Sequence, residues 1–256
     1  MRTLPAVKQL GAEMKVFHQL DMGPRPTCVD CLRGFMRNVK SSYEMLQQCA
    51  NTAWRDNIAL GATVEKGASE EHSSIGSSIP DRVALETVRE IPALIDRVEC
   101  ELLQRENDVV TFGHNDLQPG NILVGADGKM SFIDFEYARH MPRGYDVANQ
   151  WCEWAADYLS DTPHLMDYSK GPTQEQERAF ARAYLEFGAD AAISEKAVST
   201  FIEDEVKTYV PLSHLWWGVW GMLQACNTSE GDKEDEFFDY LGYGMCRLEA
   251  LKAFTE

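Results

Sequence analysis

The chain has 256 residues, 44% of them apolar and 10% aromatic, which is enough to bury a sizeable core in one large or two small domains. Its 24 Lys and Arg residues stand against 41 Asp and Glu residues, and the net charge of −17 argues against a nucleic-acid partner, because binding to a phosphate backbone needs clustered cations. The sequence has no run of about 18 apolar residues and its N-terminus lacks the apolar core of a signal peptide, so we expect a cytoplasmic protein with no membrane span.

Seven cysteines are scattered along the chain, an odd number that is typical of reduced thiols in the cytosol. Cys28 and Cys31 form a lone CxxC motif, and no second pair follows at the spacing of a zinc site. We therefore interpret this pair as structural rather than as a metal or redox site.

The N-terminal part of the chain is predicted to be mostly helical. Apolar residues recur at helical spacing in 4–20, in 35–58 and in 81–105, while Gly and Pro mark 21–34 as a loop. Residues 61–80 are rich in Gly, Ser and Glu and show no period, so they are predicted to form a flexible surface insertion.

Three short segments rich in β-branched and aromatic residues predict strands at 109–112, 121–124 and 130–135. Asp127 and Gly128 supply the turn between the last two strands. The fold class is therefore predicted as α+β, a mostly helical lobe with one small β-hairpin. Further helices are predicted at 174–188, 197–209, 213–226 and 237–254.

The stretch FGHNDLQPGNILVGADGKMSFIDFE, residues 112–136, carries the candidate catalytic residues. His114, Asp116 and Asn121 have the spacing of the H-x-D-x-x-x-x-N loop of protein kinases, and Asp134 opens a D-F element after the predicted hairpin. Phosphoryl transfer needs a carboxylate that orients the attacking hydroxyl and accepts its proton, and Asp116 fits that role.

The same stretch offers oxygen ligands for Mg²⁺, which is expected as the cofactor with ATP as co-substrate. Asp134 is predicted as the main ligand, Asn121 as the second ligand and a brace of the loop, and Glu136 as a weaker candidate. Because the hairpin turns the chain back, we expect Asp134 to lie beside Asn121.

This stretch also carries a family resemblance. The segment HNDLQPGNILV resembles the phosphotransferase signature shared by choline/ethanolamine kinases and aminoglycoside phosphotransferases, and IDFEYA followed by RGYDVANQWCEWAADY resembles the second signature of choline kinases. The resemblance runs from about Leu4 to the C-terminus and is poor at 61–80. It implies a protein-kinase-like fold in which residues 1–256 form the catalytic C-terminal lobe. It also implies phosphorylation of choline to phosphocholine for phosphatidylcholine biosynthesis, and it admits a homodimer.

The N-terminal β-lobe of the kinase-like fold is absent from the sequence pattern. No GxGxxG loop and no V-A-I-K strand is found, although these elements hold the nucleotide phosphates in kinases. The missing lobe would impair the activity. A truncated isoform, an incomplete gene model and a real half-kinase all stay open.

The quaternary ammonium of choline donates no hydrogen bond, so its recognition needs aromatic faces and nearby carboxylates. The resemblance implies a cation pocket of Glu153, Tyr158, Trp217 and Trp220, and it places Gln118 among the substrate-binding residues. Trp217 and Trp220 are three apart and share a helix face, whereas Glu153 and Tyr158 are five apart, so we expect Glu153 at a helix start.

Arg143 and Asp146 are expected to form a structural ion pair or a cap rather than to act in catalysis.

An ethanolamine or dual-specificity kinase is the alternative, although Cys152-Glu153-Trp154 favours choline. A non-catalytic lobe that binds choline or a protein partner is the alternative from a different functional class.

Overall fold

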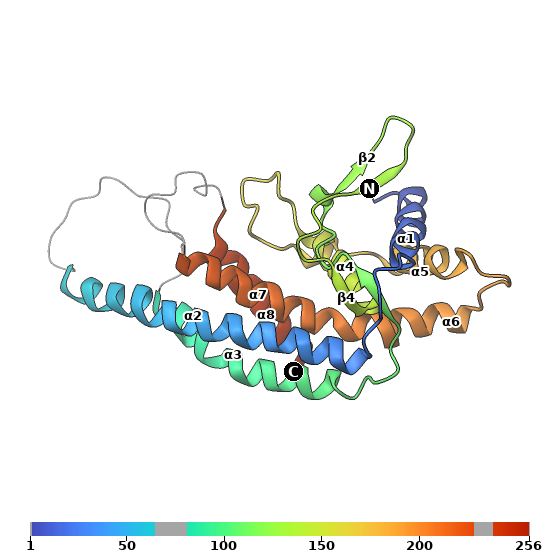
Figure 1. Cartoon of the computed structure of the whole chain (residues 1–256). Helices are drawn as coiled ribbons and strands as arrows, with labels where there is room; N and C mark the ends of the chain where they lie inside the picture. The colour runs from blue at the N-terminus through green and yellow to red at the C-terminus, as the bar shows by residue number, and fades with distance from the viewer. Residues whose placement is uncertain (1, 65–80, 228–237, 256) are drawn as a thin grey trace. The chain divides into compact units, whose positions relative to one another are not determined.

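The computed structural model describes residues 2–64, 81–227 and 238–255 (Figure 1). The chain forms two compact units. Unit 1 comprises Met1–Gly34, Glu101–Ala155 and Asp167–Ser213, and unit 2 comprises Phe35–Cys100, Ala156–Met166 and His214–Glu256. The expected insertion lies mostly outside the described residues, except that 61–64 continue a helix. Within the described ranges, no helix combines the length and the apolar character needed to cross a membrane.

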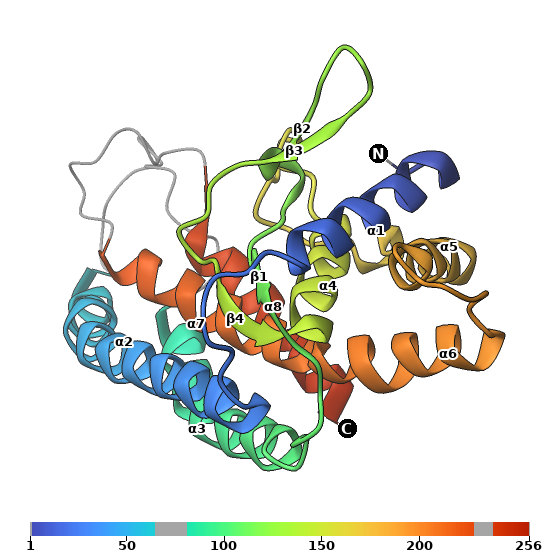
Figure 2. The same ribbon diagram turned by 45° about the vertical axis from the view of Figure 1, so that its right-hand side comes forward.

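In unit 1, helix α1 (Leu4–His18) packs along helix α5 (Gln174–Glu186), as Figure 2 shows. Val7, Leu10 and Met14, three of the apolar residues at helical spacing on α1, are buried, and so are Phe180 and Tyr184 of α5. A Cβ on Gly11 would lie 2.6 Å from the Phe180 carbonyl oxygen, so a glycine is required where the two helices meet.

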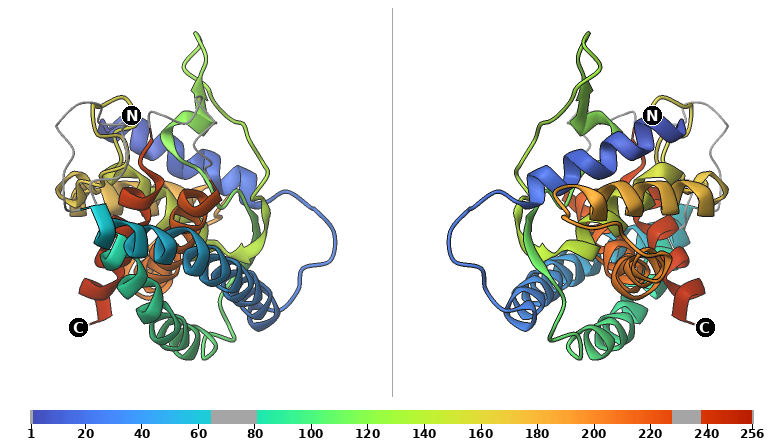
Figure 3. Two further views of the ribbon diagram at one scale, coloured as in Figure 1. Left: turned by 90° about the vertical axis from the view of Figure 1, so that its left-hand side faces the viewer. Right: turned by 90° about the vertical axis from the view of Figure 1, so that its right-hand side faces the viewer.

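Two antiparallel strand pairs lie between these helices in the sequence. Strands β2 (Ile122–Val124) and β3 (Met130–Phe132) form the predicted hairpin, which extends away from the helices of unit 1 in both views of Figure 3. Its turn depends on Gly128, whose φ of 80° is in the left-handed region. Strand β1 (Val110–Gly113) pairs instead with β4 (Arg139–Pro142), a strand that the sequence did not predict.

Helix α4 (Arg143–Cys152) begins directly after β4 and continues as the 3-10 turn η2 (Glu153–Ala155). Its N-terminal turn contacts η4 (Phe201–Val206), a π-helix between α6 (Glu195–Thr200) and η5 (Lys207–Tyr209). The single helix predicted at 197–209 is therefore wrong in detail, because the backbone changes from α to π to 3-10 geometry along this stretch. The structure also shows 3-10 turns η1 (Pro119–Asn121) and η3 (Tyr168–Lys170).

Unit 2 is built mainly from α2 (Cys28–Val64), α3 (Asp81–Leu102), α7 (Val210–Asn227) and α8 (Tyr240–Thr255), with the first and third of these helices starting in unit 1. Helices α7 and α8 approach closely. A Cβ on Gly244 of α8 would lie 2.7 Å from the backbone nitrogen of Met222 on α7. This approach brings the aromatic residues of the two helices together.

Candidate active site

The loop that carries the candidate catalytic residues is fixed by Asp146, a fully buried carboxylate on the first turn of α4. Asp146 accepts hydrogen bonds from the backbone nitrogens of His114 and Asn115, at 2.8 and 2.6 Å, and from Nε2 of His18, at 2.8 Å. Burial alone would raise the pKa of Asp146, but these donors hold it below its usual value. Asp146 is therefore ionised and anchors the loop to α4.

The expected ion pair between Arg143 and Asp146 is not formed. Asp146 pairs with His18, whose Nδ1 lies 2.7 Å from the Tyr184 hydroxyl. Arg143 pairs instead with Glu205 of the π-helix, with Nε to Oε2 at 2.7 Å and Nη2 to Oε1 at 2.8 Å. Each residue thus pairs with another element of unit 1, and the predicted ion pair between Arg143 and Asp146 is wrong.

Asp116 lies half-buried two residues after His114, and Asn121 braces it. The Asn121 Nδ2 atom donates to the Asp116 carbonyl oxygen at 2.8 Å and approaches its Oδ2 at 3.2 Å. Burial and the nearby charges of Glu153, Asp134 and Glu136 raise the pKa of Asp116 to about 8, and the Asn121 hydrogen bond offsets only part of this effect. Burial and the neighbouring carboxylates therefore make Asp116 hold its proton to a higher pH.

Asp134 lies just beyond the hairpin, next to Asn121 as the sequence predicted. The backbone nitrogen of Ile133 donates to the Asn121 carbonyl at 3.1 Å, and His114 Nε2 donates to the Ile133 carbonyl at 2.8 Å. Asp134 has a φ of 66°, unusual for a residue with a side chain. Its carboxylate and that of Glu136 are exposed, whereas His114 is completely buried.

The donor set at this edge fits Mg²⁺ better than a transition metal. Asp116, Asp134, Glu136 and Asn121 offer hard oxygen ligands, and burial together with the neighbouring carboxylates raises the pKa of Asp116. In the part of the chain that is described, no three His, Cys, Asp or Glu side chains form a metal cluster by themselves. Mg²⁺ is typically held by one or two carboxylates together with phosphates and water.

Gln118 has a local structural partner. Its Oε1 accepts a hydrogen bond from the Gly120 nitrogen at 2.8 Å and so caps η1, the turn that leads to Asn121. This contact uses the side-chain oxygen of a residue that we predicted to bind substrate.

An aromatic cluster in unit 2 contains three of the four residues predicted for the cation pocket. Trp217 and Trp220 of α7 lie with ring centroids 5.4 Å apart, and Trp220 also contacts Tyr240 and Tyr243 of α8 at 5.7 and 6.3 Å. Tyr158 joins the cluster through Phe238, with ring centroids 6.3 Å apart.

Sequence reasoning missed part of this cluster. Tyr240 and Tyr243 are three apart on α8, the same spacing that drew attention to the tryptophans of α7. Glu153 belongs to unit 1 and is buried. It follows the C-terminal end of α4 and is the first residue of the 3-10 turn η2, so it lies at a helix start as predicted.

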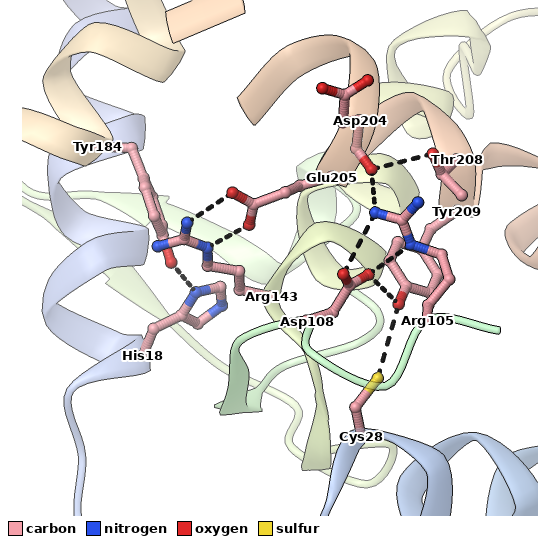
Figure 4. Close-up of polar contacts among 10 residues, drawn as sticks. All are labelled: His18, Cys28, Arg105, Asp108, Arg143, Tyr184, Asp204, Glu205, Thr208 and Tyr209. Atoms are coloured by element: carbon pink, nitrogen blue, oxygen red, sulfur yellow. Dashed lines mark hydrogen bonds and ion pairs between the residues drawn. The ribbon is translucent and has the colours of Figure 1, made fainter. Parts of the chain in front are cut away.

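Two partly buried arginines contact the π-helix of unit 1 (Figure 4). Besides the Arg143–Glu205 pair, Arg105 contacts the carbonyl oxygen of Asp204 and pairs through Nε with Asp108 at 2.7 Å. The Tyr209 hydroxyl also donates to Asp108, at 2.7 Å. These partners are far apart in sequence, so local spacing gave no signal for them.

Comparison with known proteins identifies relatives of the chain. The family model described as choline/ethanolamine kinase matches residues 1–252. The chain is 40% identical over 156 residues to probable choline kinase 2 of Arabidopsis thaliana, covering 60% of this chain and 42% of that protein. It is 37% identical over 164 residues to the choline/ethanolamine kinase of Homo sapiens, covering 58% and 39% of the two chains.

Solved structures share the fold. An ethanolamine kinase of Plasmodium vivax superposes with a TM-score of 0.58 at 22% identity, covering 98% of this chain and 60% of the other. A choline kinase of Cryptosporidium parvum gives 0.62 at 18% identity, covering 99% and 66%. The chain thus spans about two fifths of the length of the curated relatives that it matches. From the match over residues 1–252, the chain belongs to the choline/ethanolamine kinase family and has the kinase-like α+β fold of its solved members.

Proposed function

We propose that this chain takes part in ATP- and Mg²⁺-dependent phosphorylation of choline. The observation that carries the proposal is the carboxylate cluster around Asp116, whose pKa of about 8 lies near neutral pH. A group with such a pKa is well matched to accept a proton from a substrate hydroxyl. The brace from Asn121 fixes the orientation of this carboxylate.

The residues divide into three roles. Asp116 orients the hydroxyl of the amino alcohol and accepts its proton, and Asn121 holds the loop and offers a metal ligand. Asp134 is the main metal ligand and Glu136 a weaker one, and bound Mg²⁺ would neutralise charge on the phosphates of ATP. His114 is buried and donates to a backbone carbonyl, which supports a positioning role in place of a chemical one.

The aromatic cluster of unit 2 supports choline over ethanolamine. A quaternary ammonium is attracted to aromatic faces, and each face contributes about 0.5–2 kcal/mol depending on desolvation. Trp217, Trp220 and Tyr158 supply such faces within one unit. An ethanolamine kinase remains the second candidate, because a primary ammonium can donate hydrogen bonds to a carboxylate such as Glu153.

Calorimetric titration of the wild-type chain and of Trp220→Ala with choline and with ethanolamine tests the substrate. Trp220→Ala should weaken choline binding by about threefold to thirtyfold, the equivalent of the loss of one aromatic face. Ethanolamine binding should change less. Trp216→Ala is the matched control, because Trp216 lies on the same helix but packs on Phe35 and on the near side of Trp217, with ring centroids 5.2 and 6.3 Å apart, so it reports an indirect change in the cluster.

Equal losses for both ligands would make Trp220 a packing residue and remove the argument for choline. Absence of binding by a folded wild-type chain would favour the partner-binding lobe. Any phosphocholine that the chain forms from ATP and choline should fall by about 10² or more in Asp116→Asn, since the variant lacks the proton acceptor.

A further inference from the structure

Asn115 lies between the buried His114 and the half-buried Asp116, and its side-chain amide donates hydrogen bonds to the surrounding backbone. Its Nδ2 donates to the carbonyl oxygens of Gly113 at 2.9 Å, Tyr137 at 3.1 Å and Arg139 at 3.3 Å. The side chain is 2% exposed, and the backbone φ is 64°. These contacts tie the catalytic loop to a segment more than twenty residues further along the chain.

Asparagine suits both the left-handed backbone at position 115 and the three carbonyl acceptors around its side chain. Among residues with side chains, Asn and Asp best tolerate the left-handed region, and of these two only Asn carries two N–H donors. The three carbonyls also fix the orientation of the amide, because the flipped arrangement would place Oδ1 against three acceptors. Among the described residues Oδ1 has no hydrogen-bond partner, so the NH₂ group alone makes the contacts.

The segment held by Asn115 is the one that carries Asp134 and Glu136. Its beginning is fixed at Ile133, by His114 Nε2 and by the Asn121 carbonyl. Its end is fixed by Asn115 at Tyr137 and Arg139. The carboxylates of Asp134 and Glu136 form no hydrogen bond or salt bridge within the described ranges, so the backbone alone sets where they lie.

We propose that Asn115 is a positioning residue: its amide holds the C-terminal end of segment 133–139 and so sets Asp134 and Glu136 relative to Asp116. The inference deepens the proposed function and rests on it for the metal-binding role of these carboxylates. The contact is direct, because Asn115 is the neighbour of Asp116 in the loop and its own nitrogen is held by Asp146. A shift of the segment therefore changes the spacing of the proposed metal ligands.

Hydrogen–deuterium exchange of the whole chain tests the contact without requiring activity. In Asn115→Gly, which keeps the left-handed backbone and removes the amide, exchange of backbone amides 136–141 should be about tenfold faster. Tyr209→Phe is the control, because it removes one hydrogen bond to Asp108 in the same unit. In the control, amides 136–141 should stay within about twofold of wild type.

A second readout addresses the metal. Titration with Mn²⁺ in the presence of ATP, followed by water proton relaxation, should show about tenfold weaker binding in Asn115→Gly and unchanged binding in Tyr209→Phe. If the wild-type chain binds no Mn²⁺, the metal assignment of the proposed function fails, while the exchange data still decide whether Asn115 holds the segment.

Unchanged exchange at 136–141 in a folded Asn115→Gly chain would overturn the proposal. So would faster exchange spread evenly over unit 1, since that pattern is loss of general stability. Should Asn115→Gly fail to fold, wild type and the variants are compared in sucrose, which stabilises the folded state of all of them.

Discussion

Two aspartates of unit 1 show how hydrogen-bond donors decide the charge of a carboxylate. Asp146 is completely buried, yet three donors hold its pKa below the usual value. Asp116 is less buried, but its neighbours are carboxylates and its pKa rises to about 8. Burial acts in the same direction at both sites, so the partners set the difference. One residue is suited to anchor a loop and the other to exchange a proton.

The raised pKa of Asp116 predicts how stability depends on pH. A carboxyl that binds its proton more tightly in the folded state contributes stability at low pH, and this contribution is lost as pH rises through about 8. Between pH 6 and pH 9 the wild-type free energy of unfolding should therefore fall by about 2–3 kcal/mol more than that of Asp116→Asn. Urea unfolding of both chains at the two pH values measures the difference.

The exposed Asp127, in the hairpin turn, supplies the control for this experiment. Asp127→Asn should keep the pH dependence of wild type. Identical pH profiles for wild type and Asp116→Asn would show that Asp116 is ionised throughout this range and would remove the basis of its assignment as a proton acceptor.

Helix α4 and the π-helix η4 approach each other closely at Gly144. A Cβ on Gly144 would lie 2.0 Å from the carbonyl oxygen of Glu205, so any side chain there forces the two elements apart. Gly144→Ala should lower the free energy of unfolding by about 2–3 kcal/mol, the cost of overpacking. Gly171→Ala is the control, because its Cβ would meet nothing nearer than 3.3 Å. Equal and small losses in the two variants would contradict the observed packing.

The Arg143–Glu205 pair joins the same two elements and predicts a non-additive result. Its side chains are 15% and 20% exposed, so removal of one partner leaves a largely buried charge. Arg143→Met should cost about 2–4 kcal/mol, and adding Glu205→Leu should recover part of that loss. A double-mutant cycle by urea unfolding measures the recovery. Additive losses would mean that the two charges do not interact.

The elements that could be predicted from sequence are those whose signals are local. The hairpin of β2 and β3 was predicted because its Asp-Gly turn and its short apolar strands are contiguous. Strand β4 was not, since it pairs with β1 across the whole catalytic stretch. The start of α2 at Cys28 was missed, although a signal was present: the Asp30 nitrogen donates to Thr27 Oγ1 at 3.1 Å, a helix N-cap within the segment predicted as loop.

The candidate site, like the secondary-structure elements, could be predicted only where its signals are local. Asp116, Asn121 and Asp134 could be placed together from sequence because one loop and one hairpin connect them. The support of that loop could not, because Asp146 depends on His18 and, through it, on Tyr184, which lie on two other helices. The aromatic cluster was predicted only in part, because Tyr240 and Tyr243 reach Trp220 from another helix, α8.

The net charge of −17 and the aromatic cluster predict different responses to NaCl and to choline chloride, so unfolding in the two salts can separate their effects. Self-repulsion weakens as salt screens it, so NaCl should raise the melting temperature of wild type and of Trp220→Ala alike. Choline chloride at the same ionic strength screens equally, but it also binds the folded state if the cluster holds the quaternary ammonium. At a choline concentration of one hundred times Kd, binding adds about 2.7 kcal/mol to the free energy of unfolding.

The melting temperature of wild type should therefore be higher in choline chloride than in NaCl, and the excess should shrink in Trp220→Ala and persist in Trp216→Ala. Thermal unfolding followed by circular dichroism at matched ionic strength measures all six combinations. Tetramethylammonium chloride has the quaternary ammonium group of choline but lacks its hydroxyethyl arm. It should retain most of the excess melting temperature, because the aromatic faces recognise the charged group. If choline chloride and NaCl act identically on wild type, the acidic charge alone explains the salt response and the cluster is part of the core of unit 2.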